Sequence, residues 1–136
     1  MTDVVSYDDL DYSDDCLYLL KGNRFTGIAV QRDNDGRLVC EGKFLDGKEH
    51  GVALEYFSSG RVKREMPYYM GVKHGVWREW HANGKLKTES QIEFDILMES
   101  RCWNELGRLD EHFVRDPADE FAKIASEMRK RYGTAP

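Results

Sequence analysis

The chain has 136 residues, a formal net charge of −5, 40% hydrophobic residues and 33% charged residues. This length is typical of one domain, and the content of large apolar residues excludes a disordered chain. The longest uninterrupted apolar run spans residues 16–20, whereas a membrane-spanning helix needs about 18 or more apolar residues. The acidic N-terminus is also unlike a secretory signal peptide, so we expect a cytoplasmic protein with no integral membrane association.

The negative charge is concentrated in residues 1–20. This segment has six aspartates and neither Lys nor Arg, so residues 21–136 carry a net charge of +1. Because nucleic acids and anionic lipids bind basic surfaces, the sequence argues against direct nucleic-acid binding. The segment suits a basic protein partner, and a solvated N-terminus that promotes solubility is the alternative interpretation. The partner-binding candidates here are Asp8, Asp9, Asp11, Asp14 and Asp15.

Glycines recur at a fixed interval through the middle of the chain. Residues 43–66 and 67–90 share eight identities in 24 aligned positions, a weaker copy precedes them, and a degenerate copy with a one-residue deletion follows. Terminal copies that diverge are expected where a stack of repeats ends. The two series with 24-residue spacing are Gly27, Gly51, Gly75 and Gly36, Gly60, Gly84.

Each copy contains two runs of alternating polarity separated by a glycine turn, which predicts a β-hairpin. Successive hairpins would pair into an antiparallel meander, so the expected fold class is mainly β. We expect a bulge or a break near Pro67, which lacks an amide donor. The alternation predicts that one face is buried, with Val52, Leu54, Tyr56, Val62, Met66, Tyr68, Val76, Trp80, Leu86 and Ile92.

The other face is expected to be more solvated, because glutamates and lysines recur on it at Glu55, Glu65, Glu79, Glu89, Lys63 and Lys87. Large aromatic residues lie among these charges, at Phe57, Tyr69 and Trp77. Clustered exposed aromatics often mark a binding surface, and mutual bracing across strands is the alternative.

A C-terminal helix is predicted after the repeats. Asp116 suits the N-cap, Pro117 suits the first helical position, and Gly133 suits the C-terminal end. We interpret the helix as a cap on the sheet, with a partner-binding helix as the alternative. The expected divisions are an acidic segment at 1–16, the repeats at 17–113, and the helix with its tail at 114–136. The predicted apolar stripe of the helix comprises Phe121, Ile124, Ala125, Met128 and Tyr132.

Residues 71–89, GVKHGVWREWHANGKLKTE, resemble the MORN-type repeat, specifically the variant found in bacterial antitoxin proteins of the YwqK type. The same pattern recurs from Gly47 to Val62. The resemblance implies tandem hairpins and a non-enzymatic protein that protects against a co-encoded toxin by direct contact. Repeat motifs specify the fold better than the task, because the same hairpins serve different functions.

The sequence offers no linear catalytic motif, metal site or cofactor motif. His50 and His74 occupy equivalent turn positions about 10 Å apart, too far to bind one zinc ion together. The three cysteines, Cys16, Cys40 and Cys102, are widely spaced and fit reduced, mostly buried thiols. We therefore expect no enzyme, no cofactor and no metal, although catalytic groups that meet only in space would escape this search.

Two functions are predicted. The first is an antitoxin or immunity protein that binds a basic toxin, such as a nuclease or nucleic-acid-modifying enzyme. The acidic segment would mimic phosphate charge and speed association, and aromatic residues would supply buried anchors. The second is a scaffold or adaptor for proteins or for a membrane surface, for which only residues 129–131 offer clustered positive charge. The aromatic partner-binding candidates are Tyr56, Tyr69, Trp77 and Trp80.

Overall fold

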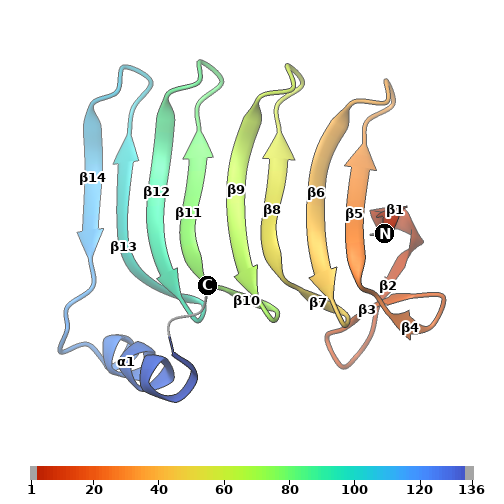
Figure 1. Ribbon diagram of the computed structural model, residues 1–136. Coiled ribbons are helices and arrows are strands. Elements are labelled where there is room, and N and C mark those ends of the chain that lie inside the picture. The colour runs from red at the N-terminus through yellow and green to blue at the C-terminus, as the bar shows by residue number, and fades with distance from the viewer. Residues whose placement is uncertain (1–2, 134–136) are drawn as a thin grey trace.

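The computed structural model describes residues 3–133, which form one long, mostly antiparallel sheet, a small three-stranded sheet near the N-terminus and one α-helix near the C-terminus. Figure 1 shows the hairpin strands side by side in chain order. The hairpin turns lie at one end of the strands, and the turns between hairpins lie at the other end. The prediction of a mainly β meander of hairpins followed by a helix is confirmed.

Four hairpins form most of the large sheet, and their positions coincide with the repeats found in the sequence. Two-residue strands extend the turns between hairpins, at β7 (Lys48–Glu49) and β10 (Val72–Lys73). The hairpin strands are β5 (Gly27–Arg32), β6 (Leu38–Leu45), β8 (Gly51–Tyr56), β9 (Val62–Tyr69), β11 (Gly75–Trp80), β12 (Leu86–Glu93), β13 (Ile96–Trp103) and β14 (Leu109–Val114).

The four hairpin turns share one hydrogen-bonding pattern. In each turn the glycine amide donates to the carbonyl three residues before it, at 2.9–3.0 Å. The glycine has a φ between 81° and 91°, a left-handed conformation that favours glycine over other residues. This requirement explains why glycine recurs there in the sequence, at Gly36, Gly60, Gly84 and Gly107.

A β-bulge in each central hairpin divides the predicted apolar face between the two faces of the sheet. Glu55 pairs with Arg64, but the next residue pairs with Val62, so Lys63 is skipped. A bulge shifts the alternation of the strand that follows it. The prediction that these residues form a single buried face is therefore wrong. Seven of its predicted residues share one face, whereas the opposite face carries Met66, Tyr68 and Ile92.

The predicted charged face is divided in the same way. Glu55 and Glu79 lie on the face of Met66, whereas Glu65 and Glu89 lie on the other face. Each face of the sheet therefore has its own row of ion pairs.

The core lies at the N-terminal end of the sheet, around Phe25, Ala29 and Phe44, whose exposed fractions are 2%, 0% and 4%. The N-terminal segment covers this core, and the Tyr7 ring contacts Phe44 edge to face at 6.0 Å. Tyr7 also lies directly over Gly42, which leaves no space for a side chain there. The segment contains β1 (Val4–Ser6), η1 (Tyr7–Asp9), β2 (Leu10–Tyr12), β3 (Tyr18–Leu20) and β4 (Asn23–Arg24).

The N-terminal segment is thus part of the folded unit. β1 pairs in parallel with β5 and protects that edge of the large sheet, while β2, β3 and β4 form a small sheet of their own. Cys16 is exposed, with Cys40 and Cys102 only partly buried, so the expectation of mostly buried thiols is wrong.

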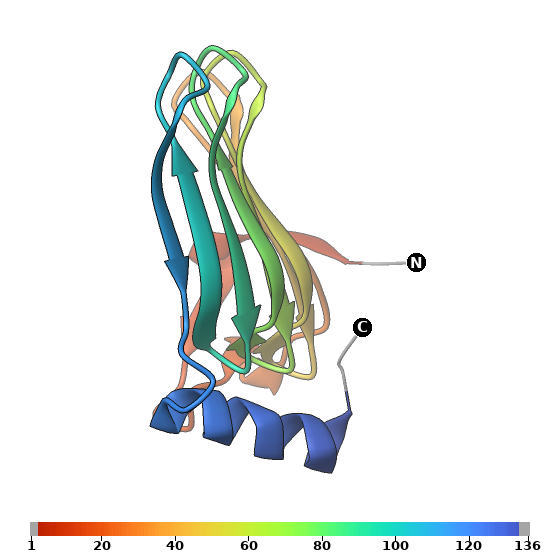
Figure 2. The same cartoon turned by 90° about the vertical axis from the view of Figure 1, so that its left-hand side faces the viewer.

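The helix α1 (Glu120–Tyr132) begins three residues later than predicted. Its N-cap is Asp119, whose carboxylate accepts hydrogen bonds from the amides of Phe121 and Ala122. Asp116 instead accepts from the Ala118 amide in the preceding turn, at 2.8 Å. Figure 2 shows the helix beneath one end of the sheet rather than over a face. The helix therefore caps the ends of the strands and covers neither face of the sheet.

The strand containing Pro67 has no bulge at the proline. Pro67 pairs with Val52 on β8, and on the other side its carbonyl accepts from His74 at 3.2 Å, where regular pairing with β11 has ended. The carbonyl of Lys43 accepts from His50 in the same way. The regular pairing between β9 and β11 therefore ends near Pro67, as predicted. The proline is not the cause, because pairing ends in the same way at Lys43, the equivalent residue of the preceding repeat.

Candidate protein-binding surface

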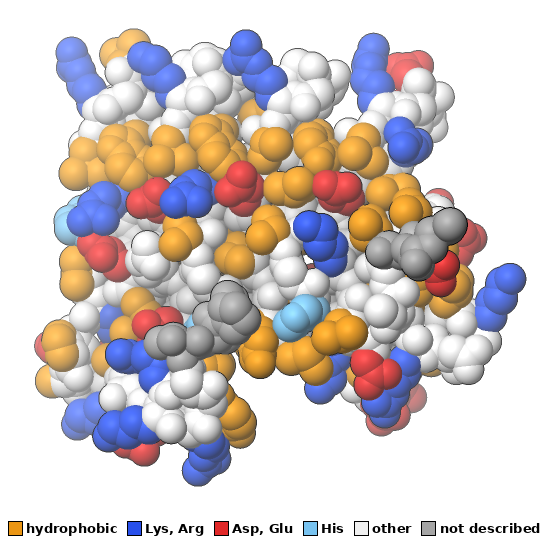
Figure 3. All heavy atoms as spheres, in the orientation of Figure 1, with side chains coloured by type: hydrophobic (Ala, Val, Ile, Leu, Met, Phe, Trp, Pro, Cys, Tyr) orange, Lys and Arg blue, Asp and Glu red, His pale blue; other side chains and the backbone are white. Residues whose placement is uncertain are grey.

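A continuous apolar stripe crosses the hairpins close to their turns, on the face that carries Glu65 and Glu89. Figure 3 shows this face, with a band of hydrophobic side chains running across the sheet. Each of the last three hairpins contributes an aromatic residue and an aliphatic residue that pair across the hairpin, and the first contributes Leu38. We call this row the stripe. It comprises Leu38, Tyr56, Val62, Trp80, Leu86, Trp103 and Leu109.

Shallow cavities adjoin the stripe at two of the three boundaries between successive hairpins. One of about 480 Å³ lies between the first two hairpins and is lined by Leu38, Tyr56 and the adjoining turns. Another of about 310 Å³ lies between the last two and is lined by Leu86, Trp103 and Gly107. Six of the seven stripe residues are half-buried and Leu109 is exposed. The stripe therefore presents apolar side chains with recesses at the boundaries between hairpins.

A row of charges borders the stripe on the side away from the turns. Arg78 lies between Glu65 and Glu89, with N–O distances of 3.8 Å and 3.1 Å. The Tyr56 hydroxyl donates to Glu41 at 2.9 Å, and burial together with this carboxylate raises the pKa of Tyr56 to about 12. The phenol is thus held as a neutral donor, which fixes the orientation of its ring.

Basic side chains border the stripe on the side of the turns. Each hairpin has one Lys or Arg directly after its turn glycine, and all four side chains are exposed. Within residues 3–133, Arg37 pairs with Asp35 at 3.6 Å, whereas Arg61, Lys85 and Arg108 have no carboxylate within 4.0 Å. Figure 3 shows basic residues at intervals along this edge. We call Arg37, Arg61, Lys85 and Arg108 the basic edge.

The four aromatic residues predicted to bind a partner do not form one cluster. Tyr56 and Trp80 belong to the stripe. Trp77 lies on the opposite face, where Lys73 is 5.0 Å from its ring and Tyr68 contacts its edge. Tyr69 is the last residue of β9 and lies beside a turn between hairpins, at the end of the strands away from the stripe. The sequence therefore identified two members of the stripe together with two aromatics from elsewhere.

Tyr69 belongs to a row of rings along the turns between hairpins. Its ring centroid is 5.3 Å from that of His50 and 6.5 Å from that of His74, and the row continues through Phe94 to Tyr132 of the helix. These contacts favour the alternative interpretation for Tyr69, in which aromatic residues brace one another across neighbouring strands.

The five candidate aspartates are all exposed in the N-terminal segment, beside β5. Tyr7 of this segment lies over Gly42, on the face opposite the stripe. The acidic segment and the stripe therefore do not form a single patch, and they offer surfaces of opposite charge.

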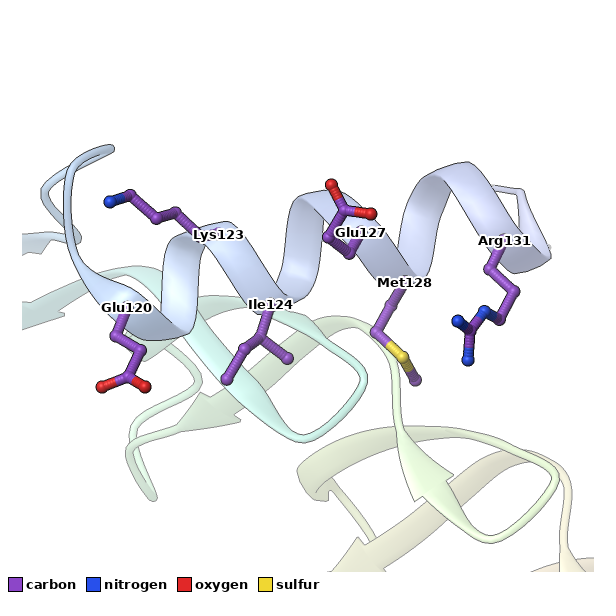
Figure 4. A pocket seen from close by; sticks show the side chains of 6 residues that line it. All are labelled: Glu120, Lys123, Ile124, Glu127, Met128 and Arg131. Carbon is purple, nitrogen blue, oxygen red and sulfur yellow. The ribbon is translucent and has the colours of Figure 1, made fainter.

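The helix provides a second, smaller apolar surface. Figure 4 shows Ile124 and Met128 pointing to the same side of α1, in a cavity of about 270 Å³ whose lining comes from the helix alone. Phe121 and Ile124 are 55% and 43% exposed, whereas Ala122 and Ala125 are buried. The helix thus packs mainly through Ala122 and Ala125, and the predicted stripe is buried only in part, because Phe121 and Ile124 lie largely in solvent.

Titratable groups of the described residues hold structural positions. The Nδ1 atom of His50 accepts from the Met70 amide and that of His74 from the Phe94 amide, so both histidines stabilise the turns between hairpins. Burial raises the pKa of the Cys40 thiol, which disfavours the reactive thiolate, and burial also raises the pKa of Glu49. Over residues 3–133 we find no group of three potential metal ligands and no helix long and apolar enough to span a membrane.

The aliphatic half of the stripe and the basic edge are not among the predicted partner-binding residues, although both are visible in the sequence. Every hairpin has the tripeptide Gly-[Arg/Lys]-[Leu/Val] at its turn, at residues 36–38, 60–62, 84–86 and 107–109. Repetition of a charged residue, which the turn geometry does not require, was the signal that could have found it.

Comparison with known families supports the repeat. Residues 49–68 and 73–93 match the family model described as MORN repeat variant, and each match begins at the last residue of a short strand and covers the central hairpin that follows, except for Tyr69 at the end of β9. Searches among curated proteins and among solved structures returned no match. The narrower resemblance to YwqK-type antitoxins stays a prediction. The two central hairpins of this chain are therefore similar to the MORN repeat variant.

Proposed function

We propose that this protein is a non-catalytic binding module that holds a protein partner on the stripe, and that it serves as an antitoxin for a co-encoded toxin. The observation that supports this proposal is the stripe itself. It presents three aromatic residues, one from each of three successive hairpins, and aromatic residues are enriched at the energetic centres of protein interfaces.

The acidic N-terminal segment supports a basic partner. Its exposed aspartates lie together at one end of the molecule, where they would mimic the phosphates of a nucleic-acid substrate and accelerate association. An enzyme that acts on nucleic acid has a basic site that binds phosphates, and such a site would attract these aspartates. The toxin proposed here is therefore a basic nuclease or nucleic-acid-modifying enzyme whose site becomes occluded.

The experiment is an affinity capture of the chain from its source cells, with matched variants on the two faces. We expect one near-stoichiometric partner that is lost with Trp80→Ala and retained with Trp77→Ala, because these tryptophans lie in the same strand on opposite faces. Thermal unfolding of both variants checks that each remains folded. The conservative variant Tyr56→Phe should retain capture, since it keeps the ring.

Growth of cells that express the captured partner tests the antitoxin role. Co-expression of the chain should restore growth, and Trp80→Ala should not. Capture that is equal for both tryptophan variants contradicts binding on the stripe. A partner that is harmless to cells contradicts the antitoxin role and favours a scaffold.

A further inference from the structure

The spacing of the stripe matches a particular backbone conformation of a bound chain. Equivalent residues of successive hairpins are two strands apart, which is about 9.4–9.8 Å at the usual strand separation. A polyproline II helix advances about 3.1 Å per residue and returns to the same side every three residues, about 9.3 Å. An extended β-strand returns to the same side after about 6.6 Å and does not match.

We propose that the stripe and the basic edge together bind an acidic protein segment in the polyproline II conformation, with one apolar side chain and one acidic side chain for each hairpin. This inference rests on the proposed function, because it specifies the part of the partner that lies on the stripe. It concerns a segment of the partner and is compatible with a basic surface elsewhere on that partner.

The recesses between hairpins provide the apolar subsites. Each recess has an aliphatic residue of one hairpin facing the aromatic residue of the next, as Leu38 faces Tyr56 and Leu86 faces Trp103. Aromatic-lined grooves are the usual binding sites for polyproline II segments, which lose little conformational entropy on binding. The third pair, Val62 and Trp80, occupies the equivalent position between the second and third hairpins.

The charge distribution favours acidic residues in the ligand. Arg61, Lys85 and Arg108 project from the turns without a carboxylate partner among residues 3–133. On the other side of the stripe the charges already compensate one another, since Arg78 pairs with Glu65 and Glu89. Uncompensated positive charge thus borders the stripe along one side only, which orients an acidic segment and gives it a direction-dependent fit.

The geometry of the basic edge is held by contacts between neighbouring turns. His81 Nε2 lies 2.8 Å from the carbonyl oxygen of Trp103, and the Asn83 amide donates to the carbonyl of Glu105 at 3.0 Å. The third and fourth turns are therefore tied together, which sets the spacing of the backbone positions that carry Lys85 and Arg108. Such preorganisation reduces the entropy lost when a ligand binds both.

The test uses fluorescence anisotropy with labelled synthetic peptides and the full chain. The probe is three repeats of Leu-Glu-Pro, and its controls are the same composition in scrambled order, three repeats of Leu-Lys-Pro, and an oligo-dT strand. We expect the acidic periodic peptide to bind about tenfold or more tightly than every control, with an affinity that falls as salt rises. Equal binding of the scrambled peptide would refute the spacing argument, and preferential binding of oligo-dT would refute a protein ligand.

Charge-matched variants locate the site. Arg61→Gln with Lys85→Gln should weaken binding of the acidic peptide about tenfold, whereas Lys21→Gln with Lys123→Gln, both exposed and away from the stripe, should leave it unchanged. Absence of binding by every peptide overturns the inference. The proposed function is tested separately. If a partner is captured through Trp80 but no peptide binds, the proposed function stands and the inference fails. If a peptide binds but no partner is captured, the proposed function fails.

Discussion

The two turn histidines occupy the same position in successive repeats but differ in burial. His74 is 8% exposed, and its Nδ1 atom accepts from the Phe94 amide at 3.0 Å, whereas His50 is less buried and its bond to the Met70 amide is 3.2 Å. A buried amide that loses its acceptor costs more than an exposed one, which water can satisfy. Equivalent positions in a repeat therefore need not be equivalent in energy.

We expect His74→Ala to lower the free energy of unfolding by about 1–3 kcal/mol and His50→Ala by about 1 kcal/mol or less. Urea denaturation of the two variants measures both. His74→Asn, whose side-chain oxygen can accept from the same amide, should recover part of the loss. Equal losses for the two alanine variants would contradict the difference in burial.

Tyr56 tests the electrostatics of the stripe. Its pKa is raised to about 12 by burial and by Glu41, so the neutral phenol stabilises the folded state below pH 10 and this contribution is lost as pH rises from 10 towards 12. We expect Glu41→Gln to lower the pKa of Tyr56 but not to its ordinary value, because burial remains. The measurement is the ultraviolet difference titration against Tyr56→Phe in each background. A pKa that Glu41→Gln leaves unchanged would exclude the carboxylate as a cause.

At the scale of elements, the docking of the N-terminal segment depends on the absence of a side chain at Gly42. A methyl group there would overlap the Tyr7 hydroxyl. We expect Gly42→Ala to increase hydrogen exchange in residues 4–20 while the central hairpins stay protected. Removal of the hydroxyl in the double variant with Tyr7→Phe should restore part of the protection. Unchanged exchange in Gly42→Ala would mean that the segment shifts without loss of stability.

The helix N-cap gives a second prediction at this scale. We expect Asp119→Ala to destabilise α1 by about 1 kcal/mol, because its carboxylate accepts from two helix amides, and Asp116→Ala to have a smaller effect. Burial opposes ionisation of Asp119, but those amides and Arg115 outweigh it and lower its pKa, so the cap weakens only as pH falls through that lowered pKa. Helix-resolved hydrogen exchange measures both effects, and a larger effect at Asp116 would support the boundary predicted from the sequence.

The sequence predicted the elements better than their faces. Period-two alternation and turn glycines located all four hairpins, because both signals are local. The bulges at Lys63 and Lys87 were missed, since an extra residue in one strand is visible only from its pairing with the other, and they moved Met66 and Tyr68 to the opposite face. The candidate site was found only in part for a different reason. Val62 and Leu86 precede the bulges and were placed on the same face as Tyr56 and Trp80, but only aromatic residues were chosen as binding candidates.

At the scale of the whole molecule, stability is distributed unevenly along the sheet. The buried core lies under the N-terminal segment, whereas all residues of β14 are exposed at the other end. Repeat proteins unfold progressively from their weakest end because each unit contacts only its neighbours. We expect the slowest hydrogen exchange in β5 and β6 and the fastest among the hairpins in β14, measured by mass spectrometry. Equal protection of β14 would indicate that another chain covers this edge.

The constant offset between hairpins has a consequence for how such a molecule changes over evolutionary time. Both ends are specialised, one by the N-terminal segment and the other by α1, whereas the two central hairpins are interchangeable in geometry. Duplication of one 24-residue unit at Gly51 would leave both ends intact and add about 10 Å to the stripe. The number of central copies would then determine how many residues of a partner are contacted, so affinity and selectivity could increase by counting repeats rather than by redesigning any of them.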